Sequence, residues 1–197
     1  MAAWSAFLRG TAALLAGDAE GAVRLHLRSI GMLPRSDGML YSLVIKAHRD
    51  AGTFAAGTAI AEQALQAARA EGDRVTEAFT LHELGLLTLL AGDPELAVAQ
   101  CRAALALALS TGRRIREGYA LLRLAQTLLG ARATGEAERI AEQAVGALTE
   151  AADPSQRAVA LAVLAEALAA EGHQERSREH YRAAAEMFTQ LGLPSAF

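Results

Sequence analysis

Few residues in this chain combine the types and the spacing that catalysis requires. Lys46 is the only lysine, and it follows Ile45 rather than the glycine-rich loop of a phosphate-binding site. His82-Glu83 begins like a zinc-protease helix, but Leu86 stands where the second histidine would be. The Gly-x-Ser-x-Gly turn of serine hydrolases is absent from the sequence. We therefore expect a protein that is not an enzyme and that needs no cofactor.

The histidines and the single cysteine do not predict a metal centre. His173 and His180 are seven residues apart, so on a helix they share a face but lie two turns from each other. That separation is too large for one ion without further ligands. Cys101 alone excludes an internal disulfide and a multi-cysteine metal site, and we expect it to be a buried filler rather than a reactive thiol. No metal site is expected.

Composition and charge describe an ordinary folded protein. The 197 residues are 52% hydrophobic and 21% charged, which is enough apolar material for a core. A net charge of −3 gives no long-range attraction to nucleic acid or anionic lipid. The first residues lack the basic start of a signal peptide, and the uncharged run 51–61 is far too short to span a membrane. We therefore expect a cytoplasmic protein. Arginine-rich usage without asparagine is typical of a GC-rich bacterial genome, so we also expect a bacterial source.

A period of 40 residues runs through the chain. Its markers are alanines at 64, 104, 144 and 184, leucines at 81, 121 and 161, and two glycine series at 52, 92 and 172 and at 72, 112 and 192. Arg132 and Ala152 stand where these series would place two further glycines. A period of this length indicates stacked supersecondary units that each contact their neighbours. We therefore expect one continuous repeat domain, 1–197, with repeats at about 1–33, 34–72, 73–112, 113–152 and 153–193.

Each unit is predicted to be a pair of helices. In 74–91 the apolar residues recur at a three-to-four spacing, and the second helix follows the turn Gly92-Asp93-Pro94. Aspartate is a favoured residue before a helix, and glycine is favoured just after one. We expect Pro34 and Pro194 just past helix ends. The predicted helices are 3–16, 19–31, 37–51, 54–71, 74–91, 94–111, 114–131, 135–151, 154–171 and 174–191.

These units resemble the tetratricopeptide repeat (TPR) family. The motif is Leu-Gly in the first helix, alanine about twelve residues later and alanine seven beyond, and here it matches Leu84-Gly85, Ala97 and Ala104. The resemblance implies an all-α, right-handed α-solenoid of about five helix-turn-helix repeats, with the first helix of each pair lining a concave face. It also implies a protein- or peptide-binding module. The family's carboxylate clamp depends on asparagine, which this chain lacks.

A narrower resemblance concerns two short phrases. Leu90–Ala97 and Leu191–Pro194 are similar to segments of the helical repeat regions in bacterial transcription activators of the antibiotic-regulatory and MalT-like types. In those activators the repeats sense effectors or bind partners beside separate DNA-binding and ATPase domains. The resemblance implies a regulatory role, either for a free-standing relative or for a fragment of a larger regulator.

The family register predicts which residues would line a ligand or partner groove. The candidate residues are aromatic or apolar at the wall and polar at the centre: Trp4, Met39, Phe79 and Tyr119, with Lys46, Arg49, His82, Arg123, Gln126 and Glu166. Such a groove suits an amphipathic peptide or a small molecule carrying a carboxylate. The alternative is that the aromatic residues pack between repeats and the charges are solvated.

Three classes of function remain open from the sequence. The first is a non-catalytic module that binds a protein or peptide partner in a regulatory or scaffolding role. The second is a repeat domain that senses a small-molecule effector. The third is a groove-based enzyme of bacterial secondary metabolism, with His82 and Glu166 as acid and base. The apolar first repeat, with Trp4, Phe7 and Leu8, also predicts a homodimer or cover from an upstream segment.

Overall fold

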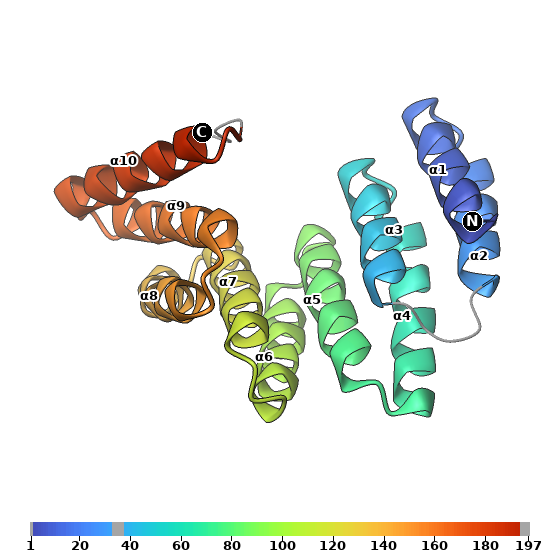
Figure 1. Ribbon diagram of the computed structural model, residues 1–197, viewed down its shortest axis with the longest axis horizontal. Coiled ribbons are helices and arrows are strands. Elements are labelled where there is room, and N and C mark those ends of the chain that lie inside the picture. The colour runs from blue at the N-terminus through green and yellow to red at the C-terminus, as the bar shows by residue number, and fades with distance from the viewer. Residues whose placement is uncertain (1, 33–37, 194–197) are drawn as a thin grey trace. The chain divides into compact units, whose positions relative to one another are not determined.

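The computed structural model describes residues 2–32 and 38–193, and the side chains of 38 and 39 lie outside the description (Figure 1). The residues described form ten helices and no strand. The helices are α1 (Ala2–Leu15), α2 (Ala19–Gly31), α3 (Gly38–Asp50), α4 (Phe54–Glu71), α5 (Arg74–Leu90), α6 (Pro94–Ser110), α7 (Arg114–Gly130), α8 (Thr134–Glu150), α9 (Pro154–Ala170) and α10 (Gln174–Gln190). Each lies within about one residue of its predicted range. The expectations for Pro34 and Pro194 fall outside the described residues.

The aspartates at the repeat turns start helices as predicted. Asp73 accepts hydrogen bonds from the backbone N–H groups of Val75 and Thr76, both at 3.1 Å. Asp153 accepts one from Gln156 at 3.0 Å, and Asp93 one from Leu96 at 3.0 Å. Each bond satisfies a donor that has no partner inside the first helical turn. The helix starts are therefore set by local sequence.

Helix ends use the left-handed backbone conformation. Gly72 closes α4 with φ of 67°, and its N–H donates to the carbonyls of Ala68 and Arg69. Gly112 has φ of 64°, as expected for a C-terminal cap. Arg132 and Ala152 adopt the same conformation, with φ of 62° and 54°, although neither is glycine. The turn is thus retained where the glycine series is interrupted.

The helices pack into two compact units, residues 1–100 and 101–197, which we describe separately. In the first unit α1 packs against α2 and α3, and α3 packs against α4 and α5. In the second unit α7 packs against α8 and α9, and α9 packs against α8 and α10. Within each unit, successive helix pairs therefore stack on their neighbours, as the repeat predicts (Figure 1).

Small residues allow the helices to approach closely. The alanines at 64, 104, 144 and 184 are fully buried, which confirms their role in packing. The last helix is different, because α10 buries only Ser177, Ala184 and Phe188. The remaining residues of α10 are mostly polar. Among the helices described, none is both long and apolar enough to cross a membrane.

Candidate functional site

An open hollow lies between α1 and α3 in the first unit. Its volume is about 590 Å³, within the range of ligand pockets. Most of its wall is apolar, and Lys46 and Asp50 contribute its charges. The lining residues are Phe7, Thr11, Leu14, Leu15, Leu43, Lys46, Ala47, Asp50 and Ala51. Of the predicted groove residues, the structure thus brings Lys46 to this hollow.

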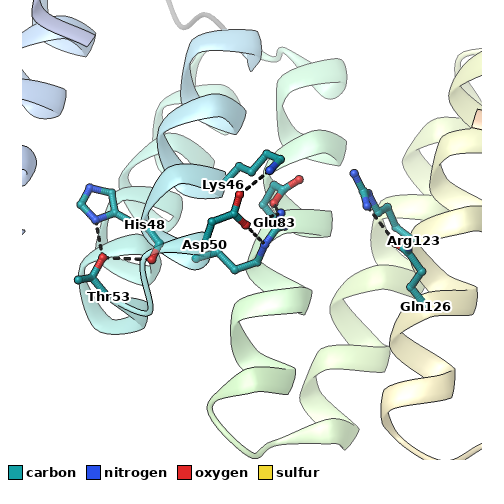
Figure 2. Close-up of polar contacts among 8 residues, drawn as sticks. Lys46, His48, Asp50, Thr53, Glu83, Arg123 and Gln126 are labelled. Atoms are coloured by element: carbon teal, nitrogen blue, oxygen red, sulfur yellow. Dashed lines mark hydrogen bonds and ion pairs between the residues drawn. The ribbon is translucent and has the colours of Figure 1, made fainter. Parts of the chain in front are cut away.

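The cations predicted to meet a ligand in this unit already have partners (Figure 2). Lys46 Nζ lies 2.5 Å from Asp50 Oδ2, and Arg49 Nη1 lies 2.6 Å from Glu83 Oε2. The side chains of Arg49 and Glu83 are only 15% and 7% exposed, so this pair between α3 and α5 is mostly buried. Burial alone would raise the pKa of Asp50, but the hydrogen bond from Lys46 and the charges of Lys46 and Arg49 outweigh it and lower the pKa.

The aromatic residues of the first unit pack against one another. Trp4 meets the Phe7 ring edge-on, with centroids 5.6 Å apart, and remains 42% exposed. Phe79 meets His82 edge-on at 6.3 Å, and His82 is only 4% exposed. This arrangement favours the interpretation of Phe79 and His82 as packing residues. A buried imidazole is poorly placed for acid or base chemistry on a bound substrate. The side chain of Met39 lies outside the described residues.

A buried pair of histidines was missed by the sequence analysis. His26 of α2 and His48 of α3 are both fully buried, and His26 Nδ1 lies 3.1 Å from His48 Nε2. Thr53 Oγ1 donates to the His48 carbonyl at 3.1 Å and lies 2.8 Å from His48 Nδ1. That hydroxyl has one hydrogen, so His48 Nδ1–H donates to Thr53. Because a neutral imidazole carries one N–H, and burial lowers the pKa of His48, its Nε2 accepts from His26.

Burial keeps both imidazoles neutral. It lowers the pKa of His26 to about 4, with a further contribution from the charge of His48 and an opposing one from the backbone of Phe7. Burial also lowers the pKa of His48. The pair joins α2 to α3 inside the first unit. Its members are 22 residues apart, so no helical spacing would have indicated it.

In the second unit Tyr119 serves as a structural tie. Its hydroxyl donates to Asp153 Oδ2 at 2.7 Å, and the same carboxylate caps α9. Burial and the bond to Asp153 raise the pKa of Tyr119 to about 12. Tyr119 therefore connects α7 to the start of α9, and its hydroxyl is already engaged.

A second open hollow lies among α7, α9 and α10. Its volume is about 550 Å³, and its lining residues are Gln126, Leu129, Gly130, Val159, Ala162, Val163, Glu166 and Phe188. Arg123 Nη1 donates to Gln126 Oε1 at 2.9 Å (Figure 2). Burial raises the pKa of Glu166. Here the structure brings together Gln126 and Glu166, both predicted groove residues, and adds Phe188, which the sequence analysis missed.

The structure places the single cysteine in the core and groups no metal-ligand side chains among the described residues. Within the described residues, no three His, Cys, Asp or Glu side chains are grouped closely enough to hold a metal ion. Cys101 is fully buried, with Sγ 3.2 Å from Thr127 Oγ1, and so fills space between α6 and α7. The interpretation of Cys101 as a packing residue is supported.

Comparison with known proteins identifies the fold. No protein-family model and no curated protein matches the chain. Solved structures do match, among them TPR-like repeats of a putative kinesin light chain from Podosopora anserina, at 16% identity and TM-score 0.70, covering 95% of each chain. A Rap protein complexed with competence and sporulation factor matches at 14% identity and TM-score 0.77, covering 95% of this chain and 54% of that one.

A third structure contains the repeats within a much larger protein. It is a signal transduction ATPase with numerous domains and a tetratricopeptide repeat sensor, from Pyrococcus horikoshii, at 13% identity and TM-score 0.71. The match covers 95% of this chain and 29% of that one. Identities this low show the fold alone. The fold is an all-α solenoid of TPR-like helical repeats.

Proposed function

We propose that the chain is a non-catalytic module that binds a protein or peptide partner. The observation that carries the proposal is the open, mostly apolar hollow between α1 and α3. An amphipathic segment would place its apolar side chains against Phe7, Leu14 and Leu43, while Lys46 and Asp50 meet its polar edge. Burial of apolar surface would supply most of the affinity.

The pairing of charges favours apolar contacts over the capture of an anion. Lys46 and Arg49 are neutralised by Asp50 and Glu83, so a ligand carboxylate would have to displace a partner that is already in place. The buried position of His82 gives no support to catalysis in this unit. We therefore favour binding over an enzymatic function.

A regulatory or scaffolding role in a bacterial cytoplasm is part of the same proposal. Its support is the resemblance of Leu90–Ala97 to the repeat regions of bacterial activators and the composition of the chain. The similar structures include one described as a sensor and one complexed with competence and sporulation factor. Small-molecule sensing is the second candidate, because the hollow has the volume of a ligand pocket.

The test is a selection of peptides on the immobilised protein, followed by affinity measurements with variants. Leu15 lines the hollow and is 87% exposed, so Leu15→Ser should leave the fold intact. We expect Leu15→Ser to weaken selected peptides by about tenfold, as the loss of one buried leucine contact would. Leu90, 52% exposed and outside the hollow, supplies the control Leu90→Ser, which should have no effect. Peptides that bind both variants equally would contradict the proposal.

The same variants address self-association. Trp4 and Leu8 on α1 are 42% and 63% exposed on the same helix as Leu15, so a second copy of the chain is an alternative occupant of this surface. Sedimentation of the free protein over a range of concentrations would detect such a homodimer. A dimer that Leu15→Ser dissociates and Leu90→Ser does not would replace the external partner with a second copy.

A further inference from the structure

The second unit's hollow combines apolar walls with one uncompensated carboxylate. Val159, Ala162 and Phe188 supply apolar surface from α9 and α10, and Glu166 stands at the same hollow one turn beyond Ala162. Gln126 closes the side formed by α7. The volume of about 550 Å³ is ample for a short alkyl chain. The hollow is open to solvent on one side.

Several glutamates of the second unit are paired, whereas Glu166 is one of those that are not. Glu117, Glu136 and Glu150 form ion pairs with arginines, as do Glu138 and Glu142. Glu166 forms no ion pair within the described part of the chain, and burial is the only cause found for its raised pKa. Glu166 is exposed at the open side of the hollow, where neighbouring protein removes part of its hydration, so a bound cation beside it would be favourable.

Tyr181 and Arg123 lie near this hollow, and neither neutralises the carboxylate of Glu166. Burial and the charge of Glu166 raise the pKa of Tyr181, so the carboxylate lies near α10 as well as on α9. Arg123 donates to the neutral amide of Gln126 and forms no ion pair with Glu166 in the described structure. The hollow thus presents negative charge beside apolar side chains.

We propose that this hollow binds an alkylammonium group, with the cation against Glu166 and the alkyl chain along Val159, Ala162 and Phe188. A free small amine and the lysine side chain of a partner share this chemistry. The proposal goes beyond the function proposed above, because it concerns the other unit and does not require the ligand to be a protein.

The test compares three probes with the same chain length. Hexylammonium, hexanol and hexanoate are titrated into the full-length protein at neutral pH and low salt, and binding is followed by two-dimensional NMR. We expect hexylammonium to bind about fivefold or more tightly than hexanol, and hexanoate to bind least, because only the cation meets an opposite charge beside the apolar wall.

Two variants separate the charge of Glu166 from the general charge of the unit. Glu166→Gln keeps the size of the side chain and should reduce hexylammonium affinity about fivefold, to the level of hexanol. Glu175 is exposed at the start of α10, 13 residues before Phe188 and so about 20 Å away along the helix. Glu175→Gln should leave all three affinities unchanged. Circular dichroism confirms that both variants are folded.

The source of the ligand is resolved by one further probe, Nα-acetyl-lysine methylamide. If it binds as well as hexylammonium, the natural ligand is a partner's lysine; if only hexylammonium binds, the ligand is a free amine. The proposal is overturned if hexylammonium does not bind, if hexanol binds equally well, or if Glu166→Gln has no effect. Leu15→Ser should not change any of these results, so this proposal and the partner-binding proposal can fail separately.

Discussion

Arg132 and Ala152 hold a backbone conformation that favours glycine. Their φ angles of 62° and 54° match those of Gly72 and Gly112, which close other repeats. A side chain in this region crowds its own backbone, at a cost of about 1 kcal/mol or more. The turn persists because the helices on either side fix it. These two residues are therefore points of local strain.

Replacing one of them with glycine should stabilise the protein. We expect Ala152→Gly to raise the free energy of unfolding by about 0.5–1 kcal/mol, because the relief of strain exceeds the added backbone entropy of glycine in the unfolded chain. Urea unfolding followed by circular dichroism measures the change. Ala151 is the control, since its φ is −76°. Ala151→Gly should lower the free energy of unfolding, and a gain in both variants would contradict the strain argument.

The local turn residues could be predicted from sequence, but the pairing of charges between helices was not. Asp73, Asp93 and Asp153 act within three residues along the chain, so their role as caps is visible in the sequence. The pair Arg49–Glu83 is 34 residues apart and depends on how α3 packs against α5. The sequence analysis did not predict this pair, and Arg49 as a groove residue stays a prediction.

At the scale of elements, a spacing of 34 residues recurs between stacked helices. It joins Arg49 to Glu83, Tyr119 to Asp153, Arg102 to Glu136 and Glu142 to Arg176. In a 40-residue repeat this spacing links a residue to a position six residues before its own equivalent in the next unit. Helices in neighbouring repeats are therefore packed with a constant offset. Opposite charges 34 apart would have been a usable sequence signal for these contacts.

The packing of α1 on α2 depends on a glycine that leaves room for a histidine ring. A β-carbon at Gly10 would lie 2.4 Å from His26 Cδ2 and 2.6 Å from His26 Nε2. His26 lies 35 residues before Ala61, the same shift that relates Gly17 to Gly52. A large ring thus replaces a small residue in the first repeat, and the loss of a side chain at Gly10 compensates for it.

Alanine at position 10 should therefore destabilise the protein. We expect Gly10→Ala to lower the free energy of unfolding by about 1–3 kcal/mol, because His26 is fully buried and has little space to move. Gly146 lies inside α8, and a β-carbon there would meet no atom within 4 Å, so it is the control. Gly146→Ala should raise the free energy of unfolding by about 0.5–1 kcal/mol through better helix propensity. Equal effects in urea unfolding would refute the steric argument.

At the scale of the whole molecule, the two units differ in the groups that titrate under mild acid. The buried pair His26–His48 belongs to the first unit, and burial lowers the pKa of both rings. In the second unit burial raises the pKa of Glu166, so the folded state favours a protonated carboxyl. The effect of Glu166 on stability in acid is therefore opposite in sign to that of the histidines. The expected result is an unequal response of the two units to acid.

Protonation of His26 lowers the stability of the folded chain, because the folded chain binds this proton less readily than the unfolded chain. The pKa of His26 is about 4 in the folded chain, against an ordinary value of 6.5, so the unfolded chain takes up the proton first as the pH falls. Stability is fully present above pH 6.5 and is lost between 6.5 and about 4. A shift of this size corresponds to a loss of about 3 kcal/mol. Asp50 also has a lowered pKa, but its contribution is lost only below its ordinary value of 3.8.

Acid should therefore unfold the first unit selectively. Trp4, the only tryptophan, lies on α1 and reports this unit by fluorescence, while circular dichroism reports all helices. We expect the urea midpoint seen by Trp4 to fall steeply as the pH drops from 6.5 toward 4. His26→Gln should lower stability at neutral pH yet reduce this slope, because one of the two buried rings is gone and only His48 still titrates. His173 is exposed before α10, and His173→Gln should keep the wild-type slope. Parallel slopes in the wild type and in His26→Gln would show that His26 does not govern the acid response.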